Sequence, residues 1–250
     1  CPNSFDLQGK RPIVYAAANG DINTVRMLIS AKAFINAPDF CQKTTLMYAV
    51  AHRHRDIVEV LIASKADVNW IDRSGKAPLL SAALNGDTDI VNMLLDAKAD
   101  PNAYDKEGLT ALMSKHIVGR PDVVKILLNA NADLEARDIA SKTALYFAVE
   151  RGCSKVTAAL LAAKADVAAR NENGYTPFIC AASADHTKLF KMLLDAKADP
   201  RVTDEDGLNA MHHAYQQHTI NTLNMLDLKE DPDMTTIIRC TTGIKLVSEF

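Results

Sequence analysis

Paired cysteines and long apolar runs are both missing from this chain, and each absence excludes a class of protein. The five cysteines are odd in number and widely scattered, with no C-x-x-C pair, which argues against a disulfide framework or a zinc site. No apolar run approaches about 20 residues, so the sequence predicts no membrane-spanning helix. Unpaired thiols are typical of a reducing compartment, and we therefore expect a cytoplasmic protein.

A strong excess of charge of either sign is also absent. The formal net charge of -3 over 250 residues provides no broad attraction to nucleic acid or to anionic lipid. The composition, 48% hydrophobic and 24% charged, is that of an ordinary folded protein. We expect neither nucleic-acid binding nor membrane insertion.

Motifs for catalysis and metal binding are missing as well. The sequence contains no H-E-x-x-H, G-x-S-x-G, Walker loop or G-x-G-x-x-G. His52 and His54 are two residues apart, and His212 and His218 are six apart, so neither pair has the spacing that metal-binding helices use. We predict no catalytic residue, no metal site and no cofactor, and we do not expect an enzyme.

A repeat with a period of 33 residues is the main feature that the sequence does contain. Leucine occupies one column of this repeat: Leu28, Leu61, Leu94, Leu127, Leu160, Leu193 and Leu226. A second column is alanine at every unit but one: Ala16, Ala49, Ala82, Lys115, Ala148, Ala181 and Ala214. A fixed period of this length is typical of a solenoid, in which each unit contacts mainly its neighbours.

The period divides residues 6–230 into seven units and leaves 231–250 outside the repeat. The units are 6–38, 39–71, 72–104, 105–137, 138–170, 171–203 and 204–230. Each is predicted to contain a turn and two short helices; in the third, Pro78 opens the first helix and Asp87 or Thr88 caps the second. Residues 231–250 are either a non-repeat tail or the start of a truncated following domain.

Several columns resemble the ankyrin repeat family. Thr176-Pro177-Phe178 and Ala77-Pro78-Leu79 stand where that family has T-P-L-H, and Ala66-Asp67-Val68-Asn69 matches its A-D-V-N exit. The resemblance covers roughly residues 6 to 230. It implies an all-α solenoid of about seven helix-loop-helix units, with hairpin-like loops that project at right angles from the antiparallel helix pairs.

Two departures from the family pattern affect the expected backbone. The family's glycine before A-D is replaced here by other residues: Lys32, Lys65, Lys98, Asn131, Lys164 and Lys197. That position takes a left-handed backbone, in which a non-glycine residue costs about 1 kcal/mol, so the geometry of these helix ends stays open. The lysines are either solvated loop charges or a stripe for an acidic partner. In the fourth unit, Lys115 and His116 replace small or apolar residues, which predicts a local irregularity.

The resemblance implies that partners meet the loop tips and the exposed ends of the first helices, on the concave side. We predict a protein-binding surface made of these residues: Phe40, His52, Trp70, Arg73, Leu84, Tyr104, Leu109, Ile117, Val118, Ile139, Glu150, Arg151, Tyr175 and Leu208. Large apolar side chains at turn tips indicate a protein partner. The alternative is that each tip residue packs on the neighbouring tip.

Asn69 and Asn102 form a second candidate site. They end the segments L-x5-D-V-N and L-x5-D-P-N, which resemble ankyrin segments that asparaginyl hydroxylases modify in animal cells. We expect hydroxylation only if the source is an animal.

The leading functional hypothesis is a non-catalytic protein-protein interaction scaffold that acts as a monomer. The alternative is the target-recruiting module of a larger multidomain enzyme or of a bacterial effector, which would place the protein in a host cytosol. The chain opens on Cys1 rather than on methionine, so we expect a fragment or a processed product.

Overall fold

The computed structural model describes residues 1–114, 120–217 and 219. Within them the chain forms twelve α-helices and one 3-10 helix. The first helices of the units are α1 (Pro12–Asn19), α3 (Thr45–Ala51), α5 (Pro78–Asn85), η1 (Ala111–Met113), α8 (Ala144–Glu150), α10 (Pro177–Ser183) and α12 (Ala210–Gln216). The second helices are α2 (Ile22–Ser30), α4 (Arg55–Ala63), α6 (Thr88–Asp96), α7 (Pro121–Asn129), α9 (Ser154–Ala162) and α11 (Thr187–Asp195).

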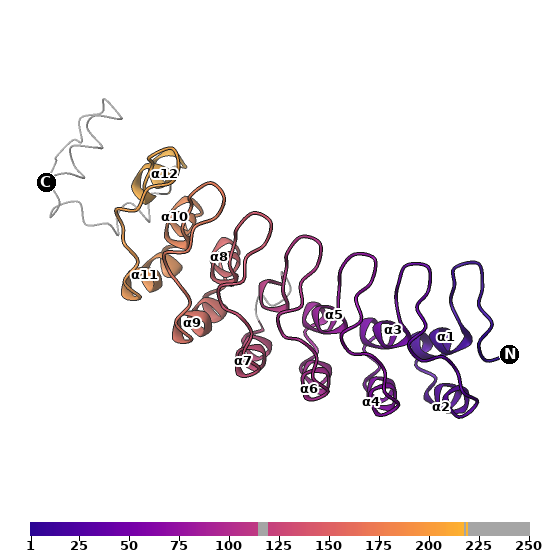
Figure 1. Ribbon diagram of the computed structural model, residues 1–250. Helices are drawn as coiled ribbons and strands as arrows, with labels where there is room; N and C mark the ends of the chain where they lie inside the picture. The colour runs from indigo at the N-terminus through magenta and orange to yellow at the C-terminus, as the bar shows by residue number, and fades with distance from the viewer. Residues whose placement is uncertain (115–119, 218, 220–250) are drawn as a thin grey trace, which may run out of the picture.

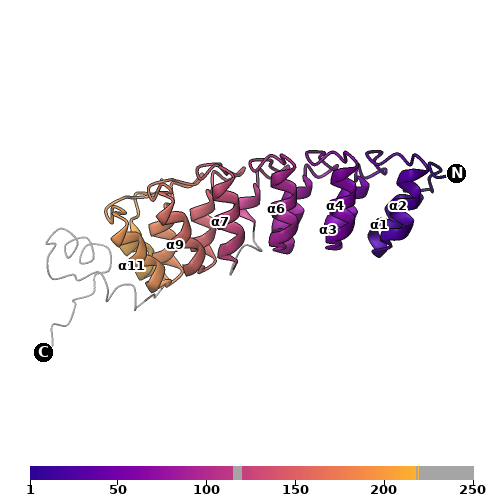
Figure 2. The same cartoon turned by 90° about the horizontal axis from the view of Figure 1, so that it is seen from below.

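The helices form two parallel rows in one open, gently curved stack (Figure 1). The first helices pack against one another along the inner row, and the second helices lie side by side along the outer row, as Figure 2 shows from below. Hairpin-like loops project from the stack on the side of the first helices. The predicted all-α solenoid is therefore confirmed, and we call the surface formed by the hairpins and the first helices the inner face.

The N-cap residues of the first helices are spaced 33 apart and so form one column of the repeat. Thr143 and Thr176 cap α8 and α10, because their side chains accept the backbone N–H groups of Tyr146 and Ile179. Where the capping residue has no suitable side chain, as at Ala77, the next residue is a proline, whose missing N–H needs no acceptor at this position. For the second helix of the third unit, the cap is Asp87 rather than Thr88.

The leucine and alanine columns form the core between units. Leu61, Leu94, Leu127, Leu160 and Leu193 are all 0% exposed. Ala49, Ala82, Ala181 and Ala214 are equally buried, and their small side chains allow adjacent helices to approach closely. The sequence prediction that each unit covers the apolar faces of the next is confirmed for these positions; Leu28 of the first unit is only half-buried, and Leu226 lies outside the described residues.

The second helices end in the left-handed geometry despite the missing glycine. The six residues of that column have φ angles between 61° and 69°, with Lys98 at 69° and Asn131 at 61°. The following N–H closes the helix: Ala99 donates to the carbonyl of Leu94 at 2.9 Å. The question left open by the sequence is thus answered in favour of the family geometry.

An asparagine of the preceding unit holds this helix end in place. Asn69 accepts the N–H of Asp100 at 2.8 Å and donates to the carbonyl of Lys98 at 3.1 Å. Asn36 bonds the next unit in the same way, through Asp67 and Lys65. Asn3 makes the same pair of bonds, whereas Asn102 and Glu135 only accept the N–H of Asp133 and of Asp166, so the full contact joins the first units of the stack.

The N-cap residues of the second helices form further hydrogen bonds and ion pairs between units. His54 bonds the carbonyl of Ala18 at 3.0 Å, and Arg120 donates to the carbonyl of Gly86 at 2.8 Å. Asp87, which is buried, pairs with Arg55 of the previous unit at 3.1 Å. Burial would raise the pKa of Asp87, but its bonds to the Ile90 N–H and to the arginine lower it overall.

The fourth unit is irregular, as its sequence predicts. In the described part of this unit, which omits 115–119, the first helix is the 3-10 turn Ala111–Met113, where the other units have helices of seven or eight residues. Lys115 and His116 lie outside the described residues, as does the segment 231–250.

We predict that Lys98→Gly raises the free energy of unfolding by about 0.5–1 kcal/mol, because glycine relieves the cost of the left-handed backbone. The matched control is Lys125→Gly within α7, which should lower stability by about 1 kcal/mol because glycine is a poor helix former. Urea denaturation followed by circular dichroism measures both. Equal destabilisation by the two substitutions would contradict the assigned backbone.

We also predict that Asn69→Ala lowers the free energy of unfolding by about 1–2 kcal/mol, because two hydrogen bonds between units are lost. Asn92→Ala, at an exposed position of α6, should change stability by less than about 0.5 kcal/mol. If both variants unfold at the wild-type midpoint, the asparagine contact does not stabilise the stack.

Candidate interaction surface

The hairpins are built around an aspartate at the start of each unit. One carboxylate oxygen of Asp39 accepts the N–H groups of Cys41 at 2.8 Å and Lys43 at 2.9 Å. The corresponding residues bond their own loops in the same pattern: Asp6, Asp72, Asp105, Asp138, Asn171 and Asp204. Each tip therefore has the same backbone shape, and equivalent side chains lie in rows along the inner face.

Backbone hydrogen bonds join each tip to the next. Arg73 donates its N–H to the carbonyl of Cys41 at 3.0 Å, and Ile139 donates to Glu107 at 3.0 Å. Gly75 allows this approach, because a Cβ there would lie 2.9 Å from the backbone nitrogen of Lys106. The tips consequently form a continuous ribbon rather than separate loops.

In the first, second and seventh units, the second oxygen of the hairpin aspartate binds a side chain of the first helix, nine residues further on. Asp39 accepts the hydroxyl of Tyr48 at 2.6 Å, and Asp204 bonds the imidazole of His213 at 2.6 Å. Burial and the bond to Asp39 both raise the pKa of Tyr48, so its hydroxyl stays protonated at neutral pH. This contact fixes the aromatic ring on the inner face.

Basic residues at the hairpin ends lie over these rings. The Lys10 ammonium is 5.2 Å from the centre of the Tyr48 ring, and the Lys142 ammonium is 5.6 Å from that of Phe147. These are cation–π distances. Lys142 also pairs with Glu150 at 2.7 Å.

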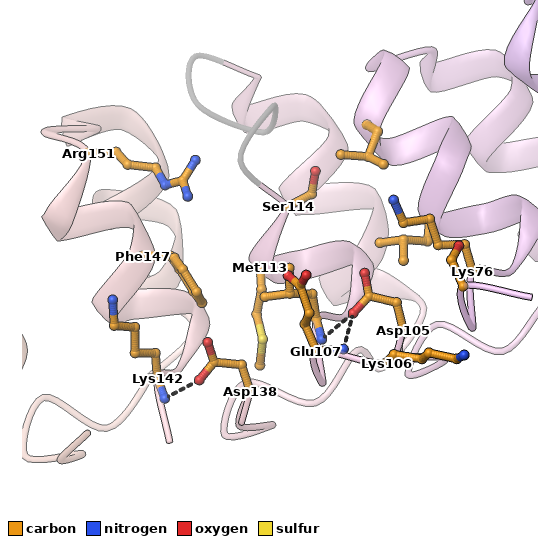
Figure 3. Close-up of a pocket in the computed structure, with 14 residues that line it drawn as sticks. Lys76, Asp105, Lys106, Glu107, Met113, Ser114, Asp138, Lys142, Phe147 and Arg151 are labelled. Atoms are coloured by element: carbon orange, nitrogen blue, oxygen red, sulfur yellow. Dashed lines mark hydrogen bonds between the residues drawn. The ribbon is translucent and has the colours of Figure 1, made fainter. Parts of the chain in front are cut away.

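Two adjacent hollows lie along the inner face, and we call the two together the inner groove. The smaller, about 360 Å³, is lined by residues that include Lys43, Tyr48 and His52. The larger, about 640 Å³, is lined by side chains of the third, fourth and fifth units (Figure 3). Leu84 and Lys76 line both hollows, so the two adjoin and together extend from the second unit to the fifth.

The larger hollow has an apolar floor and a charged rim. The floor residues are Leu80, Leu84, Leu109, Met113 and Phe147. Charged side chains of both signs also line the hollow, with Lys76, Lys106, Lys142 and Arg151 basic and Asp105, Glu107 and Asp138 acidic (Figure 3). The hollow lies beside η1, the three-residue first helix of the fourth unit.

A third hollow continues the surface toward the last unit. It measures about 510 Å³, and its charged lining is mostly acidic, with Glu172, Glu205 and Asp206 near Tyr175 and one basic residue, Lys142, which pairs with Glu150. Tyr175 stacks against His213 at a ring distance of 4.8 Å. We call this region the acidic hollow.

Comparison with known protein families identifies the repeat. The family model for ankyrin repeats (3 copies) matches residues 1–72, 79–171 and 159–236. The chain belongs to the ankyrin repeat family. No curated protein matched it.

Among solved structures, this ankyrin array is similar to the crystal structure of the ankyrin repeat domain of Bcl-3, which is described as a unique member of the IkappaB protein family. The two share 24% sequence identity with a TM-score of 0.75, and the match covers 87% of this chain and 99% of that one. At this identity the similarity shows the fold alone.

The ankyrin architecture distributes the predicted surface residues over three places. His52, Leu84, Leu109 and Arg151 line the inner groove, Glu150 pairs with Lys142 at its rim, and Tyr175 lines the acidic hollow. Phe40, Arg73 and Ile139 are exposed on the ribbon of tips, Phe40 by 57% and Ile139 by 74%. Leu208 is half-buried at the last tip, and Ile117 and Val118 lie outside the described residues.

Trp70 and Tyr104, just before successive tips, differ in their surroundings. The Trp70 indole donates to the carbonyl of Gln42 at 2.8 Å, so it joins the end of the second unit to the hairpin at the start of the same unit. Tyr104 is 68% exposed.

The two candidate hydroxylation residues are engaged in contacts between units. Asn69 donates to the carbonyl of the next unit, as described above, and Asn102 accepts the N–H of Asp133 at 2.7 Å. A hydroxylase would have to open these contacts to reach either side chain.

The sequence analysis did not predict several aromatic and apolar residues that line the inner groove. Tyr48, Met113 and Phe147 were not among the predicted residues, although Tyr48 and Phe147 share one column, nine residues after the hairpin aspartate or its equivalent. The acidic residues Glu205 and Asp206 were missed too. For Tyr48 and Phe147, the shared column of the repeat is the sequence signal that could have identified them.

The described residues show no group of histidine, cysteine or acidic side chains that could hold a metal ion.

Burial raises the pKa of the Cys180 thiol to about 11 and also raises that of Cys153, which leaves both protonated and weakly nucleophilic. Among the helices of the described chain, none is long and apolar enough to cross a bilayer.

We predict that a thiol-alkylating reagent at pH 8 modifies exposed Cys41 of the native protein at least about 100-fold faster than Cys180, whose thiolate fraction is about one in a thousand. Peptide mass spectrometry after timed quenching measures the two rates. Unfolding in urea should abolish the difference; similar rates in the native state would contradict the burial of Cys180.

Proposed function

We propose that this ankyrin array is a non-catalytic scaffold that binds a partner protein across its inner face. The observation that supports this most directly is the inner groove, which runs over several units and has an apolar floor inside a charged rim. Protein interfaces combine such an apolar centre with a polar edge. Exposed apolar side chains on the adjoining tips, Phe40 and Ile139, extend the surface available to a partner.

The rigid support of this surface fits the same function. The ribbon of tips and the asparagine contacts hold equivalent side chains at fixed intervals, so little ordering is required on binding. We further propose that the protein acts as a monomer and in the cytoplasm, where the thiols of Cys41, Cys153 and Cys180 stay reduced.

We predict that the triple variant Phe40→Ser, Ile139→Ser, Arg151→Glu loses its partner, because all three changed side chains are exposed on the inner face. Affinity should fall at least about tenfold, since aromatic and arginine contacts often contribute 1 kcal/mol or more each. Affinity capture from cell extract with quantitative mass spectrometry, followed by titration of the purified partner, measures the loss.

The matched control is Met27→Ser, Phe34→Ser, Arg26→Glu, which makes equivalent changes at exposed positions in and just after the outer helix α2. This variant should bind the partner as the wild type does. Equal recovery of one partner by the wild type and by the inner-face variant, with both folded, would place the interface elsewhere.

A further inference from the structure

The charge of the inner face changes sign along the array. Apart from the hairpin aspartates, whose carboxylates bond their own loops, and Glu107, the charged side chains on the hairpins of the first four units are basic: Lys10, Arg11, Lys43, Arg73, Lys76 and Lys106. The last two hairpins carry Glu172, Glu205 and Asp206 instead, without a lysine or arginine between 171 and 176 or between 204 and 209. A net charge of -3 for the whole chain conceals this separation.

The basic end has cations without ionic partners. In the described part of the chain, Lys43, Arg73 and Lys76 form no salt bridge. The carboxylates nearest in sequence are already engaged: Asp39 bonds two backbone N–H groups and the Tyr48 hydroxyl, and Asp72 bonds the loop around Ser74.

The acidic end is similarly unsatisfied. Glu172, Glu205 and Asp206 are all exposed around the acidic hollow, and none of them is in a salt bridge among the described residues. Between the two ends lies the apolar floor of the larger hollow, with Leu84, Leu109 and Phe147 partly accessible. The order of chemical character along the inner face is therefore basic, apolar and acidic.

We infer that the inner face binds one extended segment of a partner protein that is acidic over the second and third units, apolar over the fourth, and basic over the sixth and seventh. This inference rests on the proposed function and specifies the partner's chemistry by charge complementarity. Packed helices lie about 8–10 Å apart and an extended chain rises about 3.3 Å per residue, so each unit corresponds to about three residues. A segment crossing the second to the seventh unit is about 18 residues long.

Synthetic fluorescent peptides of about 18 residues test this inference directly. One probe carries glutamates three residues apart, then a Leu-Phe pair, then lysines three residues apart. A second has the reverse order, since the charges alone do not set the chain direction. Fluorescence anisotropy should show saturable binding of at least one of them to the wild-type protein.

Three altered versions of the binding probe separate its parts. Replacing the glutamates by glutamine, the Leu-Phe pair by serine, or the lysines by glutamine should each weaken binding at least about fivefold. A shuffled probe of the same composition, with glutamate and lysine alternating, should bind at least about tenfold more weakly, because each exposed charge pair contributes about two- to fivefold. Equal binding of the shuffled probe would overturn the inferred order.

Charge reversal on the protein provides the complementary test. The double variant Lys43→Glu, Lys76→Glu should bind the probe at least about tenfold more weakly than the wild type does. It should instead prefer a probe whose glutamates are replaced by lysine. The matched control is Lys65→Glu with Lys98→Glu, at the left-handed helix ends of the second and third units. This control makes the same change in net charge and should leave binding within about twofold of the wild type.

The outcomes separate this inference from the proposed function. If the cellular partner is lost from the inner-face triple variant but none of the ordered probes binds, the scaffold function stands and the inferred chemistry is wrong. If both charge-reversed proteins weaken the probe equally, binding follows net charge and the inference is also wrong. Preferential loss with Lys43→Glu and Lys76→Glu, together with recovery by the lysine probe, supports it.

Discussion

Burial of helix faces between adjacent units is the interaction on which the rest of this structure depends. The described α-helices have only seven to nine residues, too few to be stable alone in water. Leucines such as Leu94 and Leu127 are fully buried between neighbours, and alanines such as Ala82 allow the close approach. Stability is thus a property of the stack and not of any unit, which explains why so many polar contacts also cross from one unit to the next.

Those polar contacts convert a row of helices into a surface with fixed spacing. Asn69 joins two units at the outer helix ends, and the tip hydrogen bonds, such as that from Arg73 to Cys41, join them at the hairpins. Side chains in one column consequently repeat at regular intervals. A partner that meets this surface encounters chemistry ordered by unit, and the change from basic to acidic hairpins makes that order directional.

Much of the architecture follows from periodicity, because the spacing of 33 residues places each cap, core leucine and turn in register. Pro78 marks where the first helix of the third unit begins, and this predicted boundary agrees with the structure. The groove was less predictable. Tyr48 and Phe147 contribute to it because the inner helices face the hairpins, and a pattern of columns does not show how much of a ring remains accessible. The shortened η1 likewise follows only in outline from the unusual residues of the fourth unit.

The sequence by itself determined that the chain is an ankyrin solenoid and which columns form its core, since both depend on local spacing and on hydrophobic pattern. Only the tertiary structure decided how the second helices end and where the inner face is hollow. Lys98 adopts a backbone that its own side chain disfavours, because bonds from Asn69 and the closing N–H of Ala99 hold it there. The bond from Asn69 crosses between units, and such a contact exists only once the units are stacked.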